Sequence, residues 1–181
     1  MYLNLCTLKL NYTTNKAELF NNQKYSICGN IKKYNTTMTY TNKTQPTKIS
    51  PKVFLEKNFE NNKGIQKEAL GLIKIYTKAT GYKCIMWNKI FGFGKYYYLD
   101  SKGGEHSYLM TGFTISSTGF TLYNIISWEK YKKEITELGK YKISGKSCLK
   151  IKNVENINLE VLEKIIKKSI TEMKEKYKTE K

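Results

Sequence analysis

The sequence predicts an α+β fold, a two-layer sandwich in which a mainly antiparallel sheet of about five strands packs against helices. Apolar residues recur at helical spacing within residues 51–80 and again after residue 158. Between them, residues 84–126 contain short aromatic and β-branched runs separated by glycine or serine, which is typical of antiparallel strands. A chain of 181 residues can bury one core of ordinary size.

The predicted helices have start and stop signals. Ser50 followed by Pro51 predicts a helix start, because the serine side chain caps the first turn and proline lacks an N–H that would be unpaired there. A second helix is predicted after the break at 61–64, and Gly81 is placed to end it. A third helix is expected over residues 128–138 and a last one after Asn158.

Strands are predicted where aromatic and branched residues alternate. The predicted strands are CIMW (84–87), KYYYL (95–99), YLMTGFTI (108–115), FTLYNII (120–126) and CLKIK (148–152). The stretch SSTG (116–119) is expected to form a hairpin turn. The two glycines of FGFGK (91–95) are expected to allow a tight bend between Trp87 and the tyrosine-rich strand.

The chain is expected to contain one domain with a loose end on each side. Residues 1–43 show no sustained period and are rich in Asn, Thr, Lys and Tyr, so they are expected to form a poorly ordered arm. Residues 44–175 form the predicted domain, and residues 176–181 a charged tail. Either Met38 is the true start of the protein, or the first 37 residues are a genuine arm.

The net charge of +17 suggests an anionic partner such as nucleic acid. All 32 basic residues are lysine, however, and the absence of arginine argues against a protein that reads base edges. Four cysteines without a C-x-x-C pair, together with one histidine, argue against a zinc site. With no apolar run of about 20 residues and no signal peptide, we expect a cytoplasmic protein with free thiols and no membrane partner.

The GKS at residues 145–147 resembles the end of a phosphate-binding P-loop, but its surroundings do not. The motif requires a glycine at the position that Lys140 occupies, and Gly139 lies one residue too far away. The flanks are also reversed, because a helix is predicted before this stretch and a strand after it. Nucleotide binding at Lys146 is therefore not predicted.

The predicted sheet is rich in tyrosine hydroxyls and glycines, which suits a concave ligand-binding face. The candidate ligand-binding residues are Trp87, Phe93, Gly94, Tyr96, Tyr98, Thr111, Phe113, Tyr123, Lys140 and Lys146. Alternation along the strands would place about half of the aromatic residues in the core instead. An enzyme would have to use Cys84 or Cys148 with His106, the one histidine, and a buried free thiol is the favoured interpretation of both cysteines.

Several fragments, taken together and in order, resemble the YdhG-like family of domains of unknown function, whose architecture is similar to frataxin. They are SPKVFL (50–55), TGYKCIMW (80–87), FGFGKYYY (91–98), SKGG (101–104), TGF (111–113), FTLY (120–123), LGK (138–140) and GKSCLKIK (145–152). The resemblance covers about residues 44–173. It implies that GKSCL is the family's turn into its last strand.

The same resemblance brings iron into consideration, because some YdhG-like proteins are regarded as iron chaperones. This chain departs from the pattern, with Asn156 and Asn158 where relatives tend to carry an Asp-x-Asp. We therefore expect a non-catalytic protein that binds a small ligand, or acts like an iron chaperone, with no resident cofactor. A nucleic-acid-binding module with a lysine-rich face and exposed tyrosines is the alternative, and an enzyme using Cys148 or Cys84 is the second. The partner is expected to be a small ligand or a protein, and neither its identity nor the oligomeric state is predicted.

Overall fold

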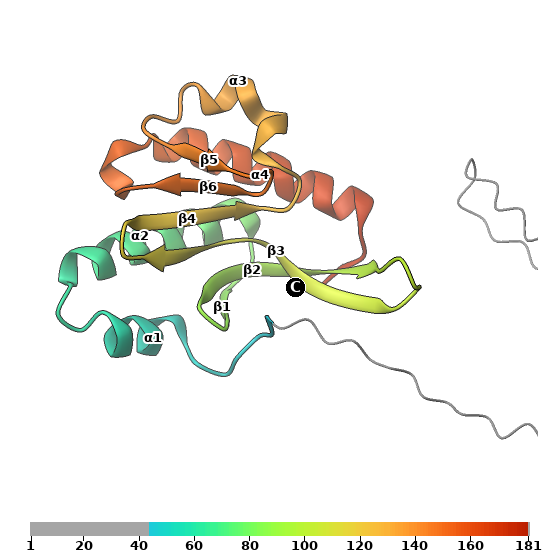
Figure 1. Cartoon of the computed structure of the whole chain (residues 1–181), viewed down its shortest axis with the longest axis horizontal. Helices are drawn as coiled ribbons and strands as arrows, with labels where there is room; N and C mark the ends of the chain where they lie inside the picture. Colours follow the sequence, from blue (N-terminus) through green and yellow to red (C-terminus); the bar gives the residue numbers. More distant parts are fainter. Residues whose placement is uncertain (1–43, 181) are drawn as a thin grey trace, which may run out of the picture. The chain divides into compact units, whose positions relative to one another are not determined.

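A computed structural model describes residues 44–180 of the chain (Figure 1). The expectations for residues 1–43 and for Lys181 lie outside this range. The helices are α1 (Pro51–Asn58), α2 (Lys63–Thr80), α3 (Lys132–Ile135) and α4 (Leu159–Lys176), with short 3-10 turns η1 (Trp128–Tyr131) and η2 (Val154–Asn156). The strands are β1 (Cys84–Trp87), β2 (Ile90–Leu99), β3 (Glu105–Ser116), β4 (Gly119–Asn124), β5 (Lys142–Ser144), β6 (Cys148–Ile151) and β7 (Thr179–Glu180).

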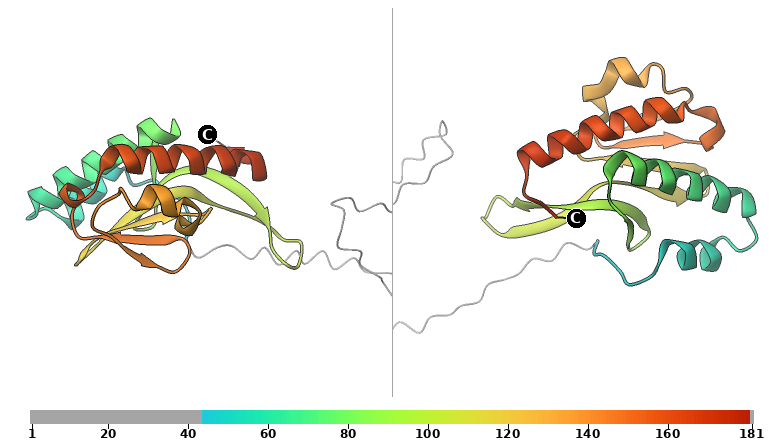
Figure 2. Two further views of the ribbon diagram at one scale, coloured as in Figure 1. Left: turned by 90° about the horizontal axis from the view of Figure 1, so that it is seen from above. Right: turned by 180° about the vertical axis from the view of Figure 1, so that it is seen from behind.

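The predicted α+β class is confirmed: an antiparallel sheet packs against helices. The strand order is β1-β2-β3-β4-β6-β5, and β7 pairs with β2. Figure 2 shows α2 and α4 side by side on one face of the sheet, while the other face carries no described helix. Seven strands rather than about five are present, because β5 and β7 have only three and two residues and too little pattern to predict.

The predicted starts of the first and last helices and the predicted end of the second are confirmed. The Ser50 side chain accepts a hydrogen bond from the Val53 N–H at 3.2 Å, with proline at the first helical position. The Asn158 side chain accepts from the N–H groups of Glu160 and Val161 at the start of α4. Gly81 follows α2 directly.

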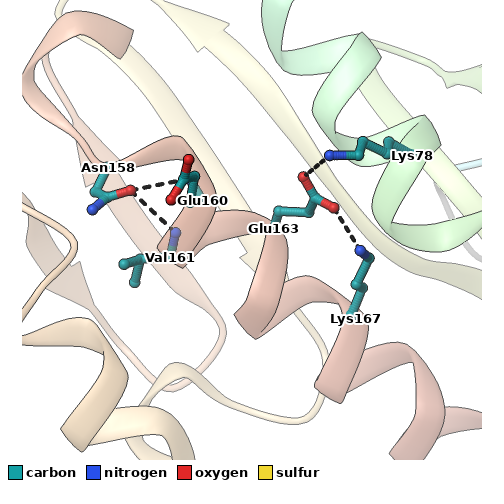
Figure 3. A network of polar contacts seen from close by, with 6 residues as sticks. All are labelled: Lys78, Asn158, Glu160, Val161, Glu163 and Lys167. Carbon is teal, nitrogen blue, oxygen red and sulfur yellow. Dashed lines mark hydrogen bonds and ion pairs between the residues drawn. The ribbon is translucent and has the colours of Figure 1, made fainter.

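The core lies between the sheet and the two long helices. On α2, Ala69, Leu72 and Tyr76 are fully buried. Tyr76 stacks on Phe93 with ring centroids 5.0 Å apart, and Phe91 stacks on Phe113 at 4.7 Å. Ion pairs also connect the two long helices. The Glu163 carboxylate of α4 contacts Lys78 of α2 at 2.8 Å and Lys167 of α4 at 2.6 Å (Figure 3).

The third helix is shorter than predicted. Residues 128–138 were expected to be one helix, but η1 and the four-residue α3 end at Ile135. The backbone that follows Ile135 forms hydrogen bonds with a distant segment. The Leu138 carbonyl accepts from the Asn158 N–H at 2.7 Å, and the Lys140 N–H donates to the Asn156 carbonyl at 3.0 Å. These pairings remove residues 138–140 from the helix.

The expected bend at FGFGK is wrong. The reversal between β1 and β2 occurs at Asn88, which has a φ of 54°, and FGFGK lies inside the ten-residue strand β2. Asparagine tolerates this left-handed conformation because its short polar side chain can bond locally. At the other end of the chain, α4 extends to Lys176, and the short strand β7 then pairs with β2. Within residues 44–180, no helix is both long and apolar enough to cross a bilayer.

Candidate functional site

A cavity of about 430 Å³ opens at the β1 edge of the sheet. The residues that line it are Pro46, Gly81, Tyr82, Lys83, Ile85, Trp87, Gly92, Gly94, Lys95 and Glu180. They come from the segment before α1, the connection from α2 to β1, the first two strands and β7. Its exposed lining is mainly apolar, with charged groups at three positions.

The cavity exists because two short strands share one edge of β2. Strand β1 pairs with residues 90–93 of β2, and β7 pairs with Lys95 and Tyr96. Gly94 lies between the two pairings, so β2 has neither strand beside it at this point. The position of the cavity therefore follows from the topology of the edge.

The two glycines of FGFGK shape the cavity wall. A Cβ on Gly92 would lie 2.5 Å from Cδ1 of Trp87, so the indole can rest against the strand only because this residue is glycine. Gly94 has a φ of 68°, and a Cβ there would lie 2.7 Å from Sδ of Met110 and 2.9 Å from the Tyr82 ring. These glycines therefore let side chains pack against β2 instead of making the bend that was expected.

The charged groups at the cavity differ in how far they are neutralised. Lys95 lies 2.6 Å from the Glu180 carboxylate, which raises the pKa of Lys95 and, in return, lowers the pKa of Glu180. The Tyr97 hydroxyl also donates to Glu180. Lys83 is exposed and makes no ion pair within the described part of the chain. The rim therefore offers one uncompensated positive charge beside an apolar interior.

The structure separates most of the predicted ligand-binding residues. Trp87 and Gly94 line the cavity. Phe93 and Phe113 are fully buried in the core, and the buried Thr111 hydroxyl donates to the Tyr123 carbonyl at 2.8 Å.

The remaining candidates are placed elsewhere. Tyr96 is buried and stacks on Tyr98, with ring centroids 5.5 Å apart. Tyr123 is half-buried on β4. Lys140 and Lys146 are exposed near β5, far along the sheet from the cavity.

Sequence reasoning missed five residues of the cavity that carry its chemistry, namely Tyr82, Lys83, Ile85, Lys95 and Glu180. Ile85 had a visible signal, because alternation along CIMW puts it on the same face as Trp87. Tyr82 and Lys83 lie in a connection without periodicity. Glu180 could not have been found, because its place depends on a pairing with β2 across more than 80 residues of chain.

Neither Cys84 nor Cys148, the two cysteines among the described residues, forms a catalytic pair with His106. Cys84 lies opposite Phe93 and His106 lies opposite Tyr98, so five residues of strand, roughly 16 Å, separate them along β2. Burial raises the pKa of the Cys84 thiol to about 12, which keeps it protonated. Cys148 on β6 lies opposite Tyr123, and Tyr123 lies opposite Gly112, which is six residues along β3 from His106.

His106 is part of a turn that Asp100 organises. Oδ2 of Asp100 lies 2.8 Å from Nε2 of His106, and Oδ1 accepts from the N–H groups of Lys102 and Gly104 at 2.8 Å each. The His106 contact and these backbone bonds lower the pKa of Asp100 to about 2. Asp100 therefore holds the β2–β3 turn.

The residues considered for iron also have structural contacts. The Asn158 side chain caps α4, and the Asn156 side chain donates to Asn153. No group of three or more His, Cys, Asp or Glu side chains suited to a metal ion occurs within residues 44–180. Comparisons of the chain with protein-family models, with curated proteins and with solved structures found no match.

Proposed function

We propose that this protein binds a small aromatic or apolar molecule carrying one anionic group, in the cavity between β1, β2 and β7, without transforming it. The observation that carries the proposal is the cavity wall, where two glycines of β2 make room for the rings of Trp87 and Tyr82. Its volume of about 430 Å³ lies within the usual range for small-molecule sites, roughly 300–1,000 Å³.

The ligand class follows from the lining. The indole of Trp87 and the ring of Tyr82 offer flat apolar contacts. Lys83 supplies a positive charge that no described acid neutralises, so an anionic group at the cavity mouth would be favoured. Lys95 is already paired with Glu180, and this pair contributes little further charge.

A binding role fits the lining better than a catalytic one. Glu180 is the one carboxylate among the cavity residues, and its lowered pKa makes it a poor general base. The raised pKa of Cys84 makes its thiol a poor nucleophile. The resemblance to the YdhG-like family, which we retain as a proposal, also implies binding rather than catalysis.

The binding proposal can be tested with anilinonaphthalene sulfonate, which combines an aromatic body with one anionic group. Calorimetric titration of the full chain should show a single site with a Kd of about 100 µM or tighter, about −5.5 kcal/mol. The Ile85→Trp variant should weaken binding at least about tenfold, because the larger side chain would fill the cavity mouth. Ile85 is 47% exposed, so the core should tolerate this change.

Leu70→Trp is the matched control, because Leu70 is 45% exposed on α2 and does not line the cavity. This variant should bind the probe as tightly as the unmodified protein. If Ile85→Trp and Leu70→Trp bind equally well, or if the unmodified protein shows no saturable site, the proposed cavity is not a binding site for this class of molecule.

Iron binding is expected to be weak, which separates this protein from the iron-chaperone activity that the resemblance implies. The amides of Asn156 and Asn158 offer no charge to a cation, and the net charge of +17 repels it. We expect ferrous iron to bind no more tightly than the millimolar range, about −4 kcal/mol, in an anaerobic titration. A stoichiometric micromolar site would contradict this and would make iron handling the better proposal.

A further inference from the structure

A second depression of about 560 Å³ lies near the opposite edge of the sheet from the cavity, where the β3–β4 turn meets β5 and β6. Four lysines line it: Lys140, Lys142, Lys150 and Lys152. We call this surface the lysine groove. Ser116, Ser117, Thr118 and Thr121 add hydroxyl groups to its lining, and Tyr141 adds an aromatic ring that is 36% exposed.

The pairing of β5 with β6 concentrates positive charge in the groove. Lys142 and Lys150 are directly opposite each other, an arrangement that costs stability because like charges repel across strands. Lys152 follows two residues after Lys150, a step of roughly 6.6 Å along an extended chain. Four cations this close together are more than a single phosphate group neutralises, so the groove suits a chain of anionic groups.

Acids do not compensate this charge. Residues 111–128 and 138–154 contain no Asp or Glu. None of the four groove lysines makes an ion pair with another described residue, whereas Lys78, Lys130, Lys167 and Lys168 are each paired with a glutamate of the helical layer. Other exposed lysines, such as Lys83, also make no ion pair within the described residues, so the groove is distinguished by having four unpaired lysines around one hollow.

We propose that the lysine groove binds the phosphate backbone of single-stranded nucleic acid. Lysine ammonium groups and hydroxyls contact phosphate without reading base edges, which agrees with the absence of arginine from the chain. The ring of Tyr141 offers a surface on which an unpaired base can stack. The residues that line the groove come from strands, turns and loops and from no described helix, so the groove offers no recognition helix for the major groove of a duplex, and the single strand is the better fit.

The test measures the anisotropy of a labelled oligothymidylate of about 20 nucleotides with the full chain at several salt concentrations. Substituting glutamine at Lys140, Lys142, Lys150 and Lys152 together should weaken binding at least about tenfold at low salt. Each phosphate contact contributes roughly 0.7 to the slope of log K against log salt, so this slope should fall by up to about 2.8. The variant should remain folded, because all four lysines are exposed and two of them repel each other.

The matched control removes the same charge from the helices. Glutamine replaces Lys57, Lys67, Lys74 and Lys164, which are exposed on α1, α2 and α4 and lie outside the groove. The control should bind the oligonucleotide within about twofold of the unmodified protein. Equal weakening by both variants would overturn the proposal, because binding would then depend on total charge alone.

Two further measurements separate nucleic acid from other anionic partners. Tyr141→Ala leaves the charge unchanged and should weaken binding at least about fivefold if a base stacks on the ring. If Tyr141→Ala binds as tightly as the unmodified protein, no base stacks on this ring. The phosphate contacts are tested separately by the lysine variants. Vesicles of phosphatidylserine should not compete with the oligonucleotide. Tighter binding to vesicles, or to a duplex of the same length, would overturn the assignment to a single strand.

Discussion

Replacing Trp128 by alanine is expected to lower the free energy of unfolding by about 4 kcal/mol, as measured by chemical denaturation. Trp128 is the largest fully buried side chain of the described residues. Its indole N–H is shared between the carbonyls of Leu122 at 3.2 Å and Ser147 at 3.0 Å, so the substitution removes both packing and hydrogen bonding.

A phenylalanine at this position separates the two contributions. Trp128→Phe keeps most of the buried ring but removes the N–H, and should cost roughly 1–2 kcal/mol. Val53→Ala, at a side chain 52% exposed on α1, should change stability by less than about 0.5 kcal/mol and serves as the control. If the phenylalanine and alanine variants are equally unstable, packing around the ring is not what Trp128 contributes.

These contacts also explain the GKS stretch. The backbone N–H of Trp128 donates to the Lys146 carbonyl at 2.9 Å, and the Ser147 carbonyl accepts from the Asn124 N–H as well as from the indole. The carbonyls of Lys146 and Ser147 thus bind β4 and η1, whereas a P-loop would direct its N–H groups toward a phosphate. GKS is therefore the turn that connects β5 to β6, the strands that carry two of the groove lysines, and its carbonyls hold this turn against β4 and η1.

The sequence predicted the helices of this fold because their signals are local. The side chains of Ser50 and Asn158 act on N–H groups within three residues of themselves, and a local pattern is sufficient to recognise such caps. The alternation in FTLYNII (120–126) likewise predicted β4, whose burial alternates along the whole strand, although the strand ends at Asn124.

The cavity could not be predicted, because it depends on how distant segments meet. The presence of Gly94 between two short edge strands follows from the pairing of Glu180 with Lys95, which no local pattern encodes. The groove was partly predictable: the excess of lysine was visible in the sequence, but the cross-strand pairing of Lys142 with Lys150 that concentrates it was not. Composition alone therefore pointed to an anionic partner without indicating where it would bind.

Replacing Gly112 by alanine is expected to lower the free energy of unfolding by about 3 kcal/mol. Gly112 of β3 lies opposite Gly92 of β2, and a Cβ on Gly112 would lie 2.3 Å from the Phe91 carbonyl oxygen and 3.2 Å from the Gly92 Cα. These are backbone atoms in the middle of the sheet, so no side-chain rotation can relieve the contact, and the strands would have to separate.

Gly71 provides the matched control for this substitution, because it lies on α2 and a Cβ there would meet nothing within 4 Å. Gly71→Ala should raise stability by roughly 0.5–1 kcal/mol, since alanine favours the helix. The two variants add the same methyl group and should change the thermal midpoint in opposite directions. If Gly112→Ala were as stable as the unmodified protein, β2 and β3 would not pack as closely as the structure shows. The cavity wall that depends on Gly92, and with it the proposed ligand site, would then need a different geometry.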